Sequence, residues 1–178
     1  MGNILFNKTR KVKSPSRAYG ATGDAGIDFY VPSYCPEFWT DLISKNPNKD
    51  YYECSITPNR DSMTITIAPH GRILIPSGIR VIMNNPGTCL LAVNKSGIAH
   101  NKGLVCGSCL VDESYIGEIH ISLINTTDEP VSVKTDDKVI QFVHLPVYYT
   151  FFQEILTEDF YKLSDGSARG ANGFGSSG

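Results

Sequence analysis

The sequence predicts an all-β domain, either a barrel or a sandwich, on two observations. Turn residues recur about every ten positions through the middle of the chain, and branched apolar residues fill the intervals. Little of the chain shows helical periodicity. With 178 residues and 41% hydrophobic residues, the chain fits one domain that buries roughly two-thirds of its unfolded surface. We therefore expect a single domain over residues 1–178.

The middle of the chain shows successive strand signals between residues 63 and 93. MTITIA (63–68) alternates apolar and polar residues, as a half-buried strand does. RILIPSGIRVIM (72–83) contains two branched apolar runs separated by the turn signal PSG. TCLLAV (88–93) follows a further break at NPG. These segments predict four short strands.

The clearest strand is GEIHISLIN at 117–125. Ile119, Ile121 and Leu123 fall at alternate positions on one face, while Glu118, His120 and Ser122 fall on the other. EPVSVKTDDKVIQFVHLPV (129–147) predicts two more strands around the turn TDD. AGIDFYVP (25–32) also reads as an apolar strand. It carries the polar Asp28, as the strand after TDD carries Gln141, and buried polar side chains need a structural partner or a ligand.

Two segments interrupt the strand pattern. Residues 33–62 form an insertion in which Pro36 marks a plausible helix start and Asn46-Pro47 a stop, so we expect a short helix there. Residues 151–178 become polar and end in SARGANGFGSSG. That ending is either a flexible linker left by cloning or an arm whose glycines close over phosphates and whose phenylalanine covers a ring.

Charge and hydropathy exclude several classes of protein. A net charge of −2 gives no broad attraction to nucleic acid, so stable nucleic-acid binding is not expected. The basic run NKTRKVKSPSR (7–17) is expected to be a solvated terminal segment. No stretch approaches the length of a membrane span, and the N-terminus lacks the apolar core of a signal peptide. We therefore expect no membrane association and a cytoplasmic location, in the host cell if the source is a virus.

The five cysteines are odd in number and scattered, which favours a reducing compartment over a disulfide framework. CGSC (106–109) resembles the nucleophile motif of papain-like proteases. However, the following aromatic is replaced by Leu110, and the remaining chain is too short for the late catalytic residues. No second ligand pair supports zinc, and the apolar alternation that follows does not suit a thioredoxin-like pair. Two small buried side chains in a strand region are expected.

Two stretches have the residue types of an active site, each with a plainer alternative. In GLVCGSCLVDESYIGEI (103–119), Asp112 and Tyr115 flank a turn and would project from the mouth of a β-hairpin. The alternative is a turn aspartate and a half-buried strand aromatic. NKSGIAHNKG (94–103) offers a hydroxyl and backbone amides for an anion-binding nest, or is an ordinary Ser-Gly turn.

The order of these pieces is more specific than any one of them. Across residues 20–178 the chain resembles the trimeric dUTPase family, which has five short motifs in a fixed sequence. DAGIDFY, KSGIA, LVDESYIGEI, DDKVIQFV and RGANGFGSSG resemble the five in turn. The match of the last motif favours the closing arm over the linker and places a mobile arm at 165–178.

The resemblance implies a distorted, jelly-roll-like β-barrel assembled as a homotrimer, with active sites where subunits meet. It implies Mg²⁺-dependent hydrolysis of dUTP to dUMP and pyrophosphate, which keeps uracil out of DNA and supplies dUMP for dTMP synthesis. Such chemistry needs a carboxylate to activate water and many donors to neutralise a triphosphate. The insertion at 33–62 is either a surface ornament or a site for a protein partner.

The resemblance also implies roles for individual residues. Asp112 would activate the water that attacks the α-phosphate, and Asp28 would hold the water shell of a Mg²⁺ bound mainly by the triphosphate. The third motif would bind uracil and deoxyribose through Ser108, Leu110, Tyr115, Glu118 and Ile119. The phosphates would be bound by Lys95, Ser96, Gly97 and Gln141. The closed arm would bind the substrate through Arg169, Gly173, Phe174, Gly175, Ser176 and Ser177.

The chain departs from the family pattern at Lys95, Cys109, Ser114 and Asp136. The lysine replaces an arginine and cannot make a bidentate phosphate contact. Two rival functions stay open. A dCTP deaminase shares the fold but needs a catalytic glutamate and would release ammonia. A β-barrel scaffold would act only by binding a protein partner.

Overall fold

The computed structural model describes most of the chain in two compact units, residues 1–147 and residues 148–178, which we treat separately. The described residues are 3–20, 23–57, 61–107, 110–164, 166–167 and 170–171.

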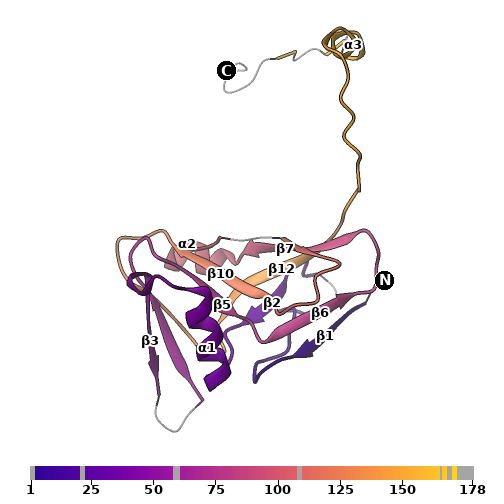
Figure 1. Cartoon of the computed structure of the whole chain (residues 1–178). Helices are drawn as coiled ribbons and strands as arrows, with labels where there is room; N and C mark the ends of the chain where they lie inside the picture. Colours follow the sequence, from indigo (N-terminus) through magenta and orange to yellow (C-terminus); the bar gives the residue numbers. More distant parts are fainter. Residues whose placement is uncertain are drawn as a thin grey trace. The chain divides into compact units, whose positions relative to one another are not determined.

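The first unit is an all-β structure, as predicted (Figure 1). Its described residues form twelve strands, two α-helices and one 3₁₀ turn. The strands are β1 (Ile4–Lys8), β2 (Ile27–Tyr30), β3 (Tyr52–Ile56), β4 (Met63–Ile67), β5 (Arg72–Pro76), β6 (Ile79–Met83), β7 (Thr88–Asn94), β8 (Leu104–Cys106), β9 (Leu110–Asp112), β10 (His120–Asn125), β11 (Val131–Lys134) and β12 (Lys138–Pro146). The helical elements are α1 (Pro36–Lys45), η1 (Lys49–Tyr51) and α2 (Ser96–Lys102).

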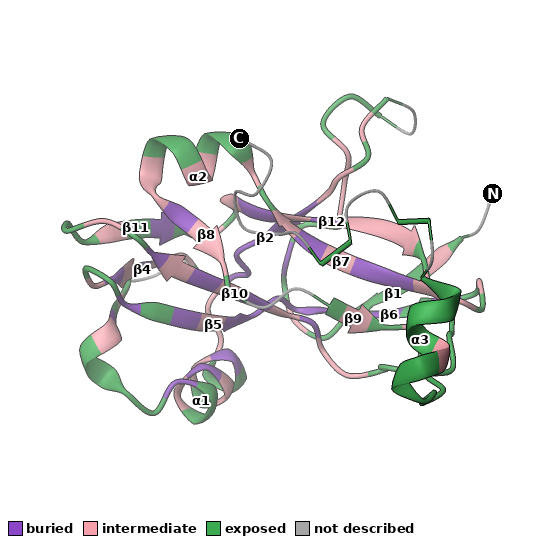
Figure 2. Cartoon of the chain, turned by 90° about the horizontal axis from the view of Figure 1, so that it is seen from above, coloured by how far each residue is buried: buried purple, intermediate pink, exposed green. Residues whose placement is uncertain are grey.

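The strands pair antiparallel in four small sheets. Their orders are β2-β12-β7-β9, β5-β10-β8, β11-β4-β3 and β1-β6. Neighbours in the chain often belong to different sheets, because the chain crosses repeatedly from one to the next. This arrangement suits the predicted barrel-like fold, and each of the four sheets contributes buried residues, among them those of β2, β7, β10 and β12 (purple in Figure 2).

The predicted strand segments are confirmed. The stretch 72–83 splits at its PSG turn into β5 and β6, and Gly78 there has a φ of 75°. A side chain at this position would be strained, and its Cβ would lie 2.8 Å from Arg10 Cγ. In β10, Ile121 and Leu123 are buried while the residues between them are half-buried, as the alternation predicted.

The helix of the insertion is also confirmed. Pro36 occupies the first turn of α1, and Cys35 Sγ accepts a hydrogen bond from the Phe38 amide as the N-cap. The helix ends at Asn46. Its Phe38 and Leu42 are fully buried, and α1 lies beside β5 (Figure 1).

Two local expectations were wrong, and one helix was not anticipated. The Ser-Gly turn is the start of α2, which ends at Gly103 in the left-handed region (φ 63°). The second unit contains α3 (Thr157–Leu163), an exposed helix (green in Figure 2) that the sequence patterns did not indicate. The basic N-terminal run is not wholly solvated, because Arg10 and Val12 are buried. Within the described ranges, no helix has the length and apolar character needed to span a bilayer.

Candidate active site

Asp112 ends β9, which is an edge strand of the largest sheet and pairs with β7 through the register Cys89 to Asp112. The carboxylate is exposed at a pocket of about 280 Å³. The pocket is lined by Lys45, Leu74, Leu110, Val111, Asp112, Tyr115, Ile119 and His120. Four of the predicted site residues therefore share one pocket: Leu110, Asp112, Tyr115 and Ile119.

The chain after Asp112 turns but does not form the predicted hairpin. The Tyr115 amide donates to the Asp112 carbonyl over 3.1 Å, which closes the turn. Among the described residues, however, β9 pairs with β7, and β10 pairs with β5 and β8. The tyrosine ring instead folds back, and its hydroxyl donates to the Glu118 carbonyl over 2.9 Å. Gly117 permits this, since a Cβ there would lie 2.5 Å from Tyr115 Oη.

The side chain of Glu118 is engaged inside the protein. Its Oε2 accepts hydrogen bonds from Arg10 Nη2 over 2.7 Å and from the Thr9 hydroxyl over 2.9 Å. Its Oε1 accepts from the Gly78 amide over 2.7 Å. Because these donors occupy both oxygens, the carboxylate anchors the loop of the pocket. A ligand would meet the backbone of this loop rather than the Glu118 carboxylate.

Lys45, Leu74 and His120 line the Asp112 pocket although the sequence did not single them out as site residues. Burial lowers the pKa of His120, and a hydrogen bond from its Nδ1 to the Glu118 carbonyl opposes that shift in part. The imidazole is therefore neutral near pH 7. The alternation of 117–125 had placed His120 opposite the core face, but no local pattern could connect Lys45 to a residue 67 positions further along the chain.

A second pocket of about 280 Å³ collects the other described candidates. It is lined by Lys95, Ser96, Gly97, Ile98, Lys138 and Gln141. Gln141 Nε2 donates to the Asn94 carbonyl over 2.9 Å and lies over Gly26, where any side chain would collide with its amide. The glycine of DAGIDFY thus leaves room for the glutamine of the fourth motif.

Asp28 is the buried acid beside this second pocket, with 4% of its side chain exposed. Lys95 Nζ lies 2.5 Å from Oδ1, and Lys138 Nζ lies 3.1 Å from Oδ2. The hydrogen bond to Asp28 raises the pKa of Lys138. Two ammonium groups against one carboxylate leave a net positive charge, which suits an anionic ligand.

The described residues do not offer a ready metal site. Within them, no group of three or more histidine, cysteine, aspartate and glutamate side chains could hold a metal ion. Each oxygen of Asp28 faces a lysine, so this carboxylate does not fit a direct metal ligand. Its assignment to the water shell of Mg²⁺ stays a prediction.

The two pockets lie at opposite ends of β7. Asp112 pairs with Cys89 near the start of this strand, and Lys95 follows its last residue, Asn94. A strand rises about 3.3 Å per residue, so about 20 Å separate the backbones at positions 89 and 95. A triphosphate is much shorter than this. A triphosphate alone therefore does not bridge the two ends of β7, and the two pockets of one chain are separate surfaces.

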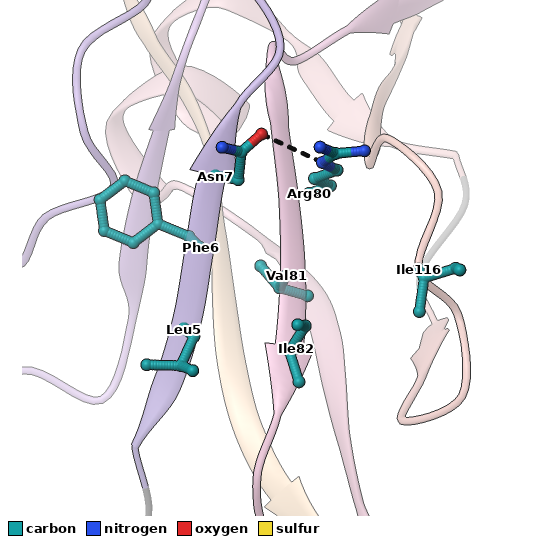
Figure 3. A pocket seen from close by; sticks show the side chains of 7 residues that line it. All are labelled: Leu5, Phe6, Asn7, Arg80, Val81, Ile82 and Ile116. Carbon is teal, nitrogen blue, oxygen red and sulfur yellow. Dashed lines mark hydrogen bonds between the residues drawn. The ribbon is translucent and has the colours of Figure 1, made fainter.

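A third pocket, of about 360 Å³, lies along β1 and β6 and contains none of the predicted site residues (Figure 3). Leu5, Phe6, Ile82 and Ile116 are exposed along it, and Arg80 Nε donates to Asn7 Oδ1 over 3.0 Å. Apolar surface of this kind is typical of protein interfaces rather than of catalysis.

The remaining predictions fall on residues that the structure does not describe. These residues are Ser108, Arg169, Gly173, Phe174, Gly175, Ser176 and Ser177. Cys109 also lies outside the described residues, whereas Cys106 is half-buried at the end of β8.

Comparison with protein families identifies one family for most of the chain. Residues 60–178 match the family model described as dUTPase. A deoxyuridine 5'-triphosphate nucleotidohydrolase of Actinobacillus pleuropneumoniae serotype 3 is 34% identical over 158 residues, covering 88% of this chain and 92% of that protein. A protein of the same name from Shewanella baltica (strain OS185) is 37% identical over 117 residues, covering 65% of this chain and 73% of that protein.

Solved structures show the same fold at lower identity. A dUTPase variant of Staphylococcus bacteriophage 80alpha, solved with dUpNHpp, superimposes with a TM-score of 0.69 at 17% identity, covering 99% of this chain and 98% of that one. A dUTPase variant from phage phi11 of S. aureus, described with a structural Mg(II) ion, superimposes with a TM-score of 0.60 at 15% identity, covering 86% of this chain and 96% of that one.

Proposed function

Because this chain belongs to the dUTPase family, we propose that it hydrolyses dUTP to dUMP and pyrophosphate. The observation that carries the proposal is the exposed carboxylate of Asp112 at a pocket that Tyr115 and Ile119 also line. A carboxylate beside a nucleoside-sized pocket supplies the base that water needs to become reactive near neutral pH.

In the proposed reaction, Asp112 accepts a proton from a water molecule as that water attacks the α-phosphorus. A new phosphorus–oxygen bond forms, and the bond from the α-phosphorus to the bridging oxygen breaks. Pyrophosphate then leaves with the electron pair of that bond. Tyr115 packs against the deoxyribose, and its hydrogen bond to the Glu118 carbonyl fixes the ring for that contact.

The separation of the two pockets supports a homotrimer with shared active sites. About 20 Å of β7 lie between the backbones at Cys89, beside Asp112, and at Lys95. The pocket of Lys95, Lys138 and Gln141 would therefore receive the phosphates of a nucleotide whose base lies on another subunit. The exposed apolar residues along β1 and β6 support burial of surface in such an assembly.

Mg²⁺ enters this proposal with the substrate, as a magnesium complex of dUTP. Triphosphates bind Mg²⁺ through their own oxygens, and the ion neutralises charge that develops on the phosphates. Lys95 and Lys138, which Asp28 orients, would neutralise further charge on the phosphates. Closure of the arm by Arg169 and Phe174, a protein partner at 33–62 and a cytoplasmic location stay predictions.

The decisive experiment measures pyrophosphate release from each deoxynucleotide, with and without Mg²⁺. We expect release from dUTP, and a fall of about a hundredfold or more in Asp112→Asn. A nonhydrolysable dUTP analogue should still bind this variant. Asp128→Asn makes the same chemical change at an exposed surface residue and should leave turnover unchanged.

The same assay separates the rival functions. Ammonia release from dCTP would identify a deaminase, and no turnover of any nucleotide would favour a scaffold. Normal hydrolysis by Asp112→Asn would remove Asp112 from the role of base.

A further inference from the structure

The insertion reaches the pocket of Asp112 through its helix. Lys45 is the last residue of α1 and lines this pocket together with Asp112 and Tyr115. The sequence had left the insertion as a surface ornament or a partner site. Its position gives it a part in the site itself.

The body of α1 is fixed on the first unit. Phe38 and Leu42 are fully buried, and the Arg10 guanidinium lies 5.7 Å from the centre of the Phe38 ring. Arg10 Nη2 also lies 2.7 Å from both Asp41 on α1 and Glu118 on the loop of the pocket. One arginine therefore ties the helix to the loop that carries Tyr115.

The end of α1 is held in place by the residue that follows it, Asn46. The Leu74 amide donates to Asn46 Oδ1, and Asn46 Nδ2 donates to the Leu74 carbonyl, each over 2.8 Å. Asn46 is buried, and Leu74 is itself a wall of the pocket. These two bonds hold the backbone of Lys45, the preceding residue, beside that wall.

A phosphate that approaches Asp112 needs a positive charge in the same pocket. Among the described residues that line it, His120 is neutral near pH 7, so the charged side chains are Lys45 and Asp112. A catalytic carboxylate repels the phosphate that it must approach. Lys95 and Lys138 of the same chain line a different pocket, at the other end of β7.

We propose that Lys45 Nζ binds the α-phosphate of the nucleotide whose uracil and deoxyribose occupy the Asp112 pocket. This inference rests on the proposed hydrolysis of dUTP. An ammonium group is a compact charge whose strongest partner is an anion, and the phosphates are the anionic part of the nucleotide. The insertion is thus a component of the active site, and Lys45 is a substrate-binding residue supplied by it.

The first test compares steady-state kinetics of full-length variants. Lys45→Met keeps the apolar stem but removes the charge, and kcat/KM for dUTP should fall about ten- to a hundredfold. Lys45→Arg should retain most of the activity. Lys134→Met removes the same charge from an exposed position on β11 that lines none of the three pockets, and should have no effect. A Lys45→Met enzyme with unchanged kcat/KM would overturn the proposal.

A binding experiment identifies the group that Lys45 contacts. By calorimetry, Lys45→Met should weaken dUMP binding while leaving deoxyuridine binding unchanged. An equal loss of affinity for both ligands would show that Lys45 contacts the base or the sugar, and would overturn the phosphate assignment. Failure of the wild-type chain to hydrolyse dUTP would instead overturn the proposed function, which distinguishes the two failures.

Discussion

The buried charge cluster at Arg10 gives a stability prediction that the structure makes quantitative. The Arg10 side chain is 7% exposed, that of Glu118 is 14% exposed and that of Asp41 is 48% exposed. Arg10→Met keeps the apolar stem but leaves the Glu118 carboxylate, among the described residues, with the Thr9 hydroxyl and the Gly78 amide as its donors. The loss therefore falls mainly on Glu118, since Asp41 can be solvated.

Removing one partner of a buried ion pair costs about 3–5 kcal/mol. We expect the lower end, about 3 kcal/mol, because the Asp41 half of the cluster reaches solvent. With a urea m-value of about 2 kcal/mol/M, the unfolding midpoint should fall by about 1.5 M. Adding Glu118→Gln removes the orphaned charge, so the double variant should be more stable than Arg10→Met alone.

The chain contains one tryptophan, Trp39, which lies half-buried on α1, the helix that carries Asp41. Its fluorescence during urea unfolding, measured at one fixed protein concentration, compares both variants with any contribution from assembly held constant. A loss below about 1 kcal/mol in Arg10→Met would place the cluster among ordinary surface ion pairs. A double variant no more stable than the single one would refute the argument from an orphaned carboxylate.

Three further predictions follow from the sequence and the structure. Truncation after Ser164 should reduce dUTP turnover about tenfold or more through lost positioning, with the proposed trimer intact by sedimentation; unchanged kinetics would assign the tail to a linker. Burial lowers the pKa of His120, so its contribution to stability is present above about pH 6.5 and falls below that pH, as the unfolded chain takes up the proton more readily. His120→Gln should weaken the dependence of the urea unfolding midpoint on pH below pH 6.5. An unchanged dependence of the midpoint on pH would contradict this prediction. Burial raises the pKa of Cys54 to about 11, so its alkylation by iodoacetamide at pH 8 should be slow in the folded chain and fast in urea; equal rates would contradict the burial.

The sequence predicted the strands well because alternation is a local signal of a half-buried sheet. It also predicted α1, since Pro36 and the Asn46-Pro47 stop are local too. It missed α2, whose seven residues are too short to show helical periodicity. Its reading of a hairpin after Asp112 failed because β9 pairs with β7, a choice that only the packing of distant strands decides.

The candidate site was predictable to the extent that it follows motifs. Asp112, Tyr115 and Ile119 share a pocket, and Lys95, Ser96, Gly97 and Gln141 share another, as their motifs suggested. The charge partners were not predictable. The pairing of Asp28 with two lysines, and of Arg10 with Glu118, joins residues far apart in the chain, and no local pattern specifies such contacts.

The position of the two pockets at either end of β7 has a genetic consequence. In the proposed trimer with shared active sites, a cell that makes two inactive variants, one altered at Asp112 and the other at Gln141, would assemble mixed trimers from both. Some of these trimers would place the intact Asp112 pocket of one variant against the intact Gln141 pocket of the other. Two inactive alleles would then complement each other and restore a part of the activity that neither possesses alone.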